Sequence, residues 1–211
     1  MGKAIIRPAA PGDAGIIAEH IYLAGKSHAK ISLYDLLFPG EKQATLDCLK
    51  RLILADTRSF FHYSHCLVYQ DGEEVVASAC CYNEAESGSE KVIEACVEVG
   101  FGPEDLVAAY QRAASFYRVV PAHPEDVWVL EHGAISEEYR GQGIIGYLID
   151  ALMERGRERG YKKTEFGMFM GHDSALMAYK KKGFVLADEK TDPEFEDLFG
   201  CPGMVRMIRG L

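Results

Sequence analysis

Residues 139–146 read Tyr139-Arg140-Gly141-Gln142-Gly143-Ile144-Ile145-Gly146, and they lead directly into an apolar helical pattern at 147–153. A glycine-rich turn that opens a helix leaves several backbone N–H groups unpaired, beside the positive end of the helix dipole. Such a turn is suited to bind a phosphate group. The same letters match two different kinds of phosphate-binding turn, so their surroundings in the sequence have to decide between them.

One alternative is the dinucleotide-binding turn, because Gly141-x-Gly143-x-x-Gly146 has its spacing. In that turn the first glycine ends a buried strand, whereas here the segment 136–140 (Ser-Glu-Glu-Tyr-Arg) intervenes after the strand. The turn also lies about two-thirds of the way along the chain, and the first βαβ unit is usually N-terminal. Glu165, the acidic residue at a suitable distance for a ribose, falls at the start of its strand. The context therefore argues against an NAD-dependent oxidoreductase.

The other alternative agrees with its context. Residues 131–144 (Glu-His-Gly-Ala-Ile-Ser-Glu-Glu-Tyr-Arg-Gly-Gln-Gly-Ile) strongly resemble motif A of the GNAT superfamily of acyl-CoA N-acyltransferases. In that motif a strand leads through a short acidic and aromatic turn into Arg-Gly-x-Gly and a long helix. Residues 172–184, which end in Tyr179 and Gly183-Phe184, resemble motif B of the same family. The segment 6–9 (Ile-Arg-Pro-Ala) is similar to the family's first strand.

The resemblance implies a single GNAT-type α/β domain over residues 1–211. We expect a mixed, mostly antiparallel sheet, splayed at its central strand and flanked by helices. The segment 83–127 carries no resemblance and is interpreted as an insertion between the third and fourth strands, with a helix at about 103–117 that starts at a proline. Residue patterns predict strands at 4–7, 65–69, 74–82, 128–135, 164–170, from 184 and at 204–208, and helices after 13, at 41–55, after the glycine turn to about 159, and at 174–182.

The resemblance also implies an activity: transfer of an acetyl group from acetyl-CoA to a primary amine, by direct attack in a ternary complex. Acetyl-CoA is the acyl-donor co-substrate, and neither a metal nor a covalent enzyme intermediate is implied. The backbone of Ile135 would pair with the pantetheine arm like an added strand, and Arg140 would lie beside the pyrophosphate. The backbone N–H groups expected to bind the pyrophosphate belong to Gly141, Gln142, Gly143, Ile144 and Ile145.

Two residues depart from the family pattern. The family usually has glycine or alanine where this chain has Ile145, and the small residue here is displaced to Gly146. A side chain at 145 is expected to point near the cofactor and to alter the pyrophosphate geometry. His172 replaces the usual asparagine that contacts the cofactor arm, and an imidazole can still donate or accept a hydrogen bond.

Two side chains are the candidate catalytic residues. Tyr179 occupies the position of the family's general acid, which protonates the departing CoA thiolate; the alternative is a core tyrosine on an amphipathic helix. Glu131 is the leading candidate base, acting through a water molecule; the alternative is a half-exposed strand carboxylate. His132 should point to the opposite face from Glu131 if the strand is regular, and a structural role is favoured for it. Gly133 fits a bulge in the same strand.

The composition of the chain argues against several classes of binding partner. The chain has 211 residues and a net charge of −9, so it lacks the basic surface that nonspecific nucleic-acid binding needs. No apolar run approaches a membrane span, and the N-terminus has no signal-peptide pattern. Six cysteines lie scattered without a CxxC pair or metal-ligand spacing. They favour reduced thiols in a cytoplasmic protein and no metal site.

The acceptor is expected to be a small-molecule or peptide amine. Acidic residues cluster in the insertion and in the last loop, and they either attract a cationic amine or serve only solubility; they are Glu84, Glu86, Glu90, Glu94, Glu98, Asp188, Glu189, Asp192, Glu194, Glu196 and Asp197. A homodimer is compatible with the resemblance. A CoA-binding regulatory module without turnover is the main alternative function.

Overall fold

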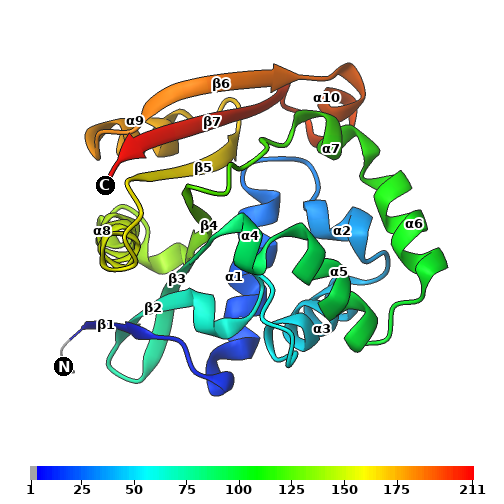
Figure 1. The fold of residues 1–211 in the computed structure, drawn as a ribbon, viewed down its shortest axis with the longest axis horizontal. Coiled ribbons are helices and arrows are strands. Elements are labelled where there is room, and N and C mark those ends of the chain that lie inside the picture. The colour runs from blue at the N-terminus through cyan, green and yellow to red at the C-terminus, as the bar shows by residue number, and fades with distance from the viewer. Residues whose placement is uncertain (1–3) are drawn as a thin grey trace.

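The fold is organised around one open, mixed sheet in the computed structural model, which describes residues 4–211. Its seven strands lie in the order β1-β2-β3-β4-β5-β7-β6 (Figure 1). Only β4 and β5 pair in parallel among the strands described; the other neighbours are antiparallel. The expected mixed, mostly antiparallel sheet is therefore confirmed. The strands are β1 (Ile5–Pro8), β2 (Cys66–Asp71), β3 (Glu74–Tyr82), β4 (Trp128–Ile135), β5 (Lys163–Phe169), β6 (Val185–Thr191) and β7 (Gly203–Gly210).

Helices cover both faces of the sheet. Apolar residues of α1 (Ala14–Lys26) and α3 (Lys42–Ile53) form one core with β2 and β3, and α8 (Ile144–Glu158) forms a second core on the other face. Within residues 4–211, no helix combines the length and apolar character needed to cross a membrane. The other α-helices are α2 (Leu33–Leu37), α4 (Glu84–Ser87), α5 (Ser89–Glu98), α6 (Pro103–Arg112), α7 (Ala114–Val119), α9 (Asp173–Lys181) and α10 (Pro193–Phe199).

The contact of α8 with the sheet follows from its sequence. Ile144, Leu148 and Leu152 recur at every fourth position and are buried, as expected for the apolar face of a helix. Near its C-terminal end the helix contacts Trp128 through a glycine, because a Cβ on Gly156 would lie 2.6 Å from the indole ring. The indole N–H of Trp128 also donates to the Leu152 carbonyl over 3.0 Å. These contacts hold the C-terminal part of α8 against the start of β4.

The sheet is splayed between β4 and β5, as expected. These strands pair only at Trp128↔Thr164 and Val129↔Glu165 among the described residues, and the Thr164 hydroxyl donates to the Trp128 carbonyl over 2.8 Å. Beyond this point β5 continues beside β7, and β4 continues beside β3. The edge of β4 that faces β5 is therefore free of strand pairing over most of its length.

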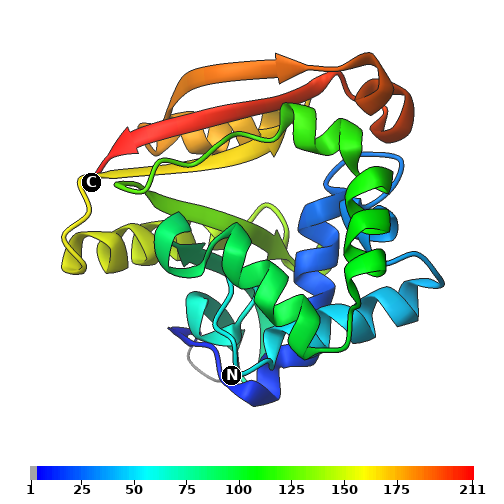
Figure 2. The ribbon, with the colours of Figure 1, turned by 45° about the vertical axis from the view of Figure 1, so that its right-hand side comes forward.

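The insertion between β3 and β4 contains four α-helices where one was expected. The predicted helix at 103–117 is divided at Ala113 into α6 and α7, and the acidic stretch before it forms α4 and α5. The guanidinium of Arg112 donates to the Leu36 carbonyl over 2.7 Å, and that of Arg118 binds Asp192 at 2.6 Å. The α6–α7 segment therefore links α2 to α10 along one side of the molecule (Figure 2).

Two further helices were not predicted, because each is too short to show a helical period in the sequence. The segment 26–40 has an irregular pattern, yet Ser32 and Asp35 form a capping box that starts α2. In the last acidic stretch, Asp192 accepts from the Phe195 N–H over 2.9 Å and is followed by a proline, which starts α10.

The expectation of six reduced cysteines is wrong for one pair. Cys66 on β2 and Cys80 on β3 are cross-strand partners, 4.0 Å apart at Cα, and form a disulfide. Their separation of 14 residues carries no motif, so only the strand register brings them together. The remaining four cysteines are free.

Candidate active site

The strand β4 contains the predicted bulge. Glu131 pairs with Cys80 and Ala134 pairs with Ser78, so two residues of β4 lie opposite the single residue between these partners on β3. His132 has a φ of 55°, which is left-handed and uncommon for a residue with a side chain. A bulge of this kind bends its strand and turns the local side chains. Here it lies where β4 departs from β5.

The free edge of β4 presents backbone groups toward the splay. The Ser136 N–H donates to the Val76 carbonyl on β3 over 2.8 Å. Neighbouring N–H groups of a strand point to opposite edges, so the N–H of Ile135 is directed away from β3 and toward the gap. An extended ligand could pair with this edge in the way that an added strand does.

The glycine turn has the geometry of an anion-binding loop. Gly141 and Gly143 have φ values of 79° and 76°, a conformation that favours glycine, and α8 begins directly afterwards. The Gly146 N–H donates to the Gly143 carbonyl over 2.9 Å. Within residues 4–211, no backbone carbonyl accepts from the N–H groups of 141–145. Arg140 is exposed beside the turn, 4.0 Å from Glu137.

The structure gives a packing reason for glycine at position 146, where the small residue of this turn lies in place of position 145. A Cβ on Gly146 would lie 3.2 Å from Cε of Lys182, whose ammonium pairs with Asp150 on α8. The side chain of Lys182 therefore occupies the space over position 146, where glycine leaves room for it. Ile145 is half-buried and packs against the core under α8.

His172 lies directly before α9 and close to the glycine turn. Its Nδ1 is 3.3 Å from the Ser27 hydroxyl, and its ring centroid is 5.2 Å from that of His28. Burial lowers the pKa of His172, and the charges of His28 and Arg140 lower it further. The imidazole is therefore near Arg140, and it favours the neutral form that can accept or donate a hydrogen bond.

Glu131 is a half-buried carboxyl group in the bulged part of β4. Loss of water raises its pKa to about 7, against a smaller lowering by His123. Its negative charge contributes to raised pKa values at Tyr34, Tyr82 and Tyr179. A carboxyl group with a pKa near neutrality is suited to accept and release a proton at physiological pH.

Tyr179 reaches the bulge from α9, across the splay. Its ring packs against Phe166, with centroids 3.9 Å apart, and against Phe184 at 5.9 Å. The phenol oxygen lies 3.7 Å from the position that a Cβ on Gly133 would take. Burial, followed by the charge of Glu131, raises the pKa of Tyr179 to about 12. The phenol is therefore protonated at neutral pH and faces the place where Gly133 has no side chain.

His132 is buried, as a structural histidine would be, but the expected alternation with Glu131 is wrong. The positive φ turns its ring toward Tyr34, whose hydroxyl lies 2.6 Å from Nε2, and the ring stacks on Phe61 at 5.5 Å. Glu131 pairs with Cys80, which belongs to the same core cluster as Tyr34, so Glu131 and His132 are associated with the same face of the sheet. Desolvation lowers the pKa of His132 to about 3.

His123 and Tyr34 were missed by sequence reasoning. His123 lies in the loop before β4, and its Nδ1 is 2.6 Å from the buried carboxylate of Glu165, which also binds Arg206 at 3.1 Å. Glu165 is thereby occupied, which removes it as a ribose ligand and further weakens the dinucleotide alternative. Only the Ser32-Asp35 capping box would have indicated that Tyr34 lies on a helix.

Most of the acidic residues considered for attracting a cationic amine have partners. Glu86 binds Arg159, Glu94 binds Lys91, and Glu98 accepts from the N–H groups of residues 56 and 57. In the C-terminal part, Asp188 binds Arg206, while Asp192 and Glu194 bind Arg118. These contacts leave less unpaired negative charge than the sequence suggests.

Comparison with known proteins shows the family to which the chain belongs. Residues 31–184 match the family model described as "Acetyltransferase (GNAT) family". Over 55 residues the chain is 36% identical to a mycothiol acetyltransferase of Corynebacterium aurimucosum, covering 26% of this chain and 18% of that protein. Over 68 residues it is 26% identical to an uncharacterized N-acetyltransferase of Bacillus subtilis, covering 32% and 43%. The chain thus spans less than half the length of these curated relatives.

Solved structures share the fold over nearly the whole chain. An N-acetyltransferase from Staphylococcus aureus Mu50 superposes with a TM-score of 0.70 at 22% identity, covering 97% of this chain and 100% of that one. An N-acetylglutamate synthase from Neisseria gonorrhoeae, complexed with coenzyme A and N-acetyl-glutamate, has a TM-score of 0.53 at 12% identity, covering 100% and 36%. At these identities the likeness shows the fold.

Proposed function

Since this chain belongs to the GNAT family of acetyltransferases, we propose that it transfers the acetyl group of acetyl-CoA to a primary amine by direct attack in a ternary complex. The observation that carries the proposal is the convergence of three features at one splay. These features are the free edge of β4, the unpaired N–H groups of the glycine turn, and the phenol of Tyr179 beside Gly133.

Acetyl-CoA would lie along the splay. The N–H groups of Gly141, Gln142, Gly143, Ile144 and Ile145 would bind the pyrophosphate, with Arg140 beside it. The pantetheine arm would pair with the backbone at Ile135, and His172 would contact the cofactor arm. The backbone N–H of Ile135, which is directed toward the gap, would stabilise the oxyanion that forms when the amine attacks the thioester.

Proton transfer would couple Glu131 to Tyr179. With a pKa of about 7, Glu131 takes a proton from the incoming ammonium group through a water molecule. The negative charge of Glu131 is one cause of the raised pKa of Tyr179. When Glu131 becomes neutral, that contribution disappears, and Tyr179 becomes a stronger acid as the CoA thiolate departs.

Two measurements test this function. Calorimetry with acetyl-CoA and with NAD should give binding of acetyl-CoA alone, and an amine panel should release CoA thiol with at least one acceptor. Binding of NAD without CoA would refute the proposal. Binding of acetyl-CoA without thiol release from any amine would favour the regulatory CoA-binding module.

The acceptor would enter on the side bordered by α2 and the α6–α7 segment. Arg118→Ala would release α7 from Asp192 and Glu194 on α10. We expect a severalfold higher acceptor KM, because the segment loses its anchor, with unchanged affinity for CoA. Arg157→Ala is the matched control, since Arg157 is exposed and binds Glu154 within α8. Equal KM values in the two variants would contradict this entry side.

A further inference from the structure

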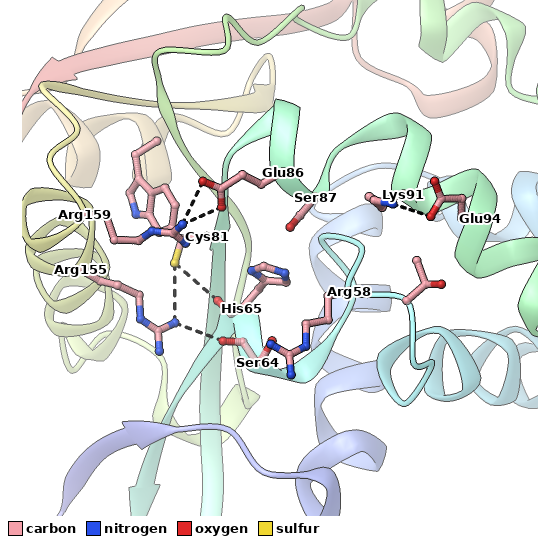
Figure 3. Close-up of a pocket in the computed structure, with 12 residues that line it drawn as sticks. Arg58, Ser64, His65, Cys81, Glu86, Ser87, Lys91, Glu94, Arg155 and Arg159 are labelled. Carbon is pink, nitrogen blue, oxygen red and sulfur yellow. Dashed lines mark hydrogen bonds and ion pairs between the residues drawn. The ribbon is translucent and has the colours of Figure 1, made fainter.

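A polar cavity lies at the end of α8 farthest from the glycine turn. Its volume is about 610 Å³. Arg155 and Arg159 reach it from α8, Arg58 reaches it from the loop after α3, and His65 lies on its wall (Figure 3). No step of the proposed acetyl transfer uses these residues.

The cavity is separate from the splay. Gly143 and Arg155 are 12 positions apart along the chain, which corresponds to about 18 Å along a helix. The cavity wall also includes Cys81, which belongs to the core under α8. Cys80, the cross-strand partner of Glu131, belongs to the core under α1. The cavity and Glu131 are therefore associated with opposite faces of the sheet.

The basic residues that line the cavity differ in whether they have an acidic partner. Arg159 is neutralised by Glu86, at 2.6 and 2.9 Å, and Lys91 is neutralised by Glu94, at 2.6 Å. Arg58 and Arg155 have no carboxylate partner within residues 4–211. The whole chain has 32 acidic and 23 basic residues. In so acidic a protein, two guanidinium groups that line one cavity without a carboxylate partner form a local excess of positive charge.

The contacts of Arg155 leave its guanidinium poorly satisfied. Arg155 is half-buried, and its acceptors are the Ser64 carbonyl at 3.5 Å and the Cys81 sulfur at 3.9 Å. Both contacts are long, and a partly buried cation without a close partner is costly. The Nε2 atom of His65 on the same wall is also buried without a hydrogen-bond partner in the described chain. These groups are arranged to receive an anion.

We propose that this cavity binds a small phosphorylated molecule, with the phosphoryl group between Arg58 and Arg155. Guanidinium groups bind phosphate oxygens through two parallel hydrogen bonds, which suits two arginines that line one cavity. The volume exceeds that of a phosphate ion and lies in the range of pockets for small organic ligands. The molecule would therefore carry an organic body, and its binding is independent of the proposed acetyl transfer.

The test uses the single tryptophan of the chain, Trp128, which lines the cavity under the guanidinium of Arg159. Glycerol phosphate is titrated at constant ionic strength while Trp128 fluorescence is recorded, with and without saturating CoA. We expect a saturable change under both conditions, and none with glycerol. Absence of a saturable change would refute the proposal. Loss of the signal on adding CoA would assign the phosphate to the glycine turn and would equally refute it.

Variants locate the site. Arg155→Gln and Arg58→Gln should each raise the Kd for glycerol phosphate by about tenfold or more, because each removes a charge-assisted contact. Arg157→Gln, on the same helix but paired with Glu154, should leave the Kd unchanged. Arg58 is exposed, so its variant keeps the test valid if Arg155→Gln fails to fold. Wild-type Kd values in Arg58→Gln, or in a folded Arg155→Gln, would overturn the assignment.

Discussion

At the scale of single residues, the proposed acetyl transfer would depend on two groups, Glu131 and Tyr179, whose pKa values differ in the direction that acyl transfer needs. Glu131 has a pKa of about 7 and Tyr179 a pKa of about 12. Burial raises both values, because both groups are charged when deprotonated. In the proposed reaction, Glu131 would accept a proton readily at neutral pH, and Tyr179 would keep its proton until the thiolate departs.

Replacing Tyr179 by phenylalanine should lower kcat by about 10²- to 10⁴-fold, the usual contribution of a positioned acid. The ring would still pack against Phe166 and Phe184, so the affinity for CoA should be unchanged. Steady-state kinetics and calorimetry measure the two quantities. An unchanged kcat would leave Tyr179 as a core residue only.

Glu131 should control the acid limb of the pH–rate profile. Its carboxylate form is the proposed base, so kcat/KM should rise as the pH increases through about 7. Glu131→Gln should lower kcat/KM and abolish this limb, since the amide does not titrate. Persistence of the same limb in the variant would assign the base to another group or to a water network.

At the scale of elements, the contact between α8 and β4 depends on the missing side chain at Gly156. A methyl group there would lie 2.6 Å from the Trp128 ring and 2.8 Å from Leu211. Gly156→Ala should therefore destabilise the protein by about 1–3 kcal/mol, the cost of overpacking. Gly15→Ala in α1 is the matched control.

Position 15 has open space within 4 Å, so alanine there should stabilise the helix by about 0.5–1 kcal/mol. Urea unfolding of the two variants gives both free energies. A Gly156→Ala protein as stable as wild type would show that the Trp128 contact adjusts without cost.

The helices and strands differ in how well sequence patterns predict them. The strands β2, β3 and β4 and the helix α8 follow from turn signals and periodicity, because each pattern is local. The helices α2 and α10 were missed although Ser32 and Asp192 cap them, since short helices carry too few turns to show a period. The bulge at Gly133 was foreseen, but the positive φ of His132 depends on its ring packing against Tyr34.

At the scale of the whole molecule, the buried His20 and His132 and the half-buried His65 link stability to pH. Desolvation lowers the pKa values of His20 and His65 to about 4 and that of His132 to about 3. The unfolded chain therefore binds more protons than the native protein below pH about 6.5. Stability from these groups is complete above that pH and is lost as the pH falls toward 4. Glu131, whose pKa is raised, acts in the opposite sense.

Replacing His20 by glutamine should reduce this acid sensitivity. His20 is 1% exposed and contacts the Ser78 hydroxyl at 3.0 Å. In the variant, the slope of the unfolding free energy against pH should fall by up to about 1.4 kcal/mol per pH unit between pH 6 and 4.5. Urea unfolding at several pH values measures the slope. An unchanged slope would mean that His20 is protonated without unfolding.

The sequence by itself determined the glycine turn, the order of the main strands and the assignment of Tyr179 and Glu131 as candidates. The motifs at residues 139–146 and 172–184 are each contained in a short stretch of sequence. Such motifs can be identified without knowing which residues are in contact in the fold. Only the tertiary structure decided that His132 and Glu131 are associated with one face of the sheet, that Glu165 is occupied by His123 and Arg206, and that Arg58 and Arg155 line one cavity. These relations join residues far apart in the chain, and packing alone fixes their distances.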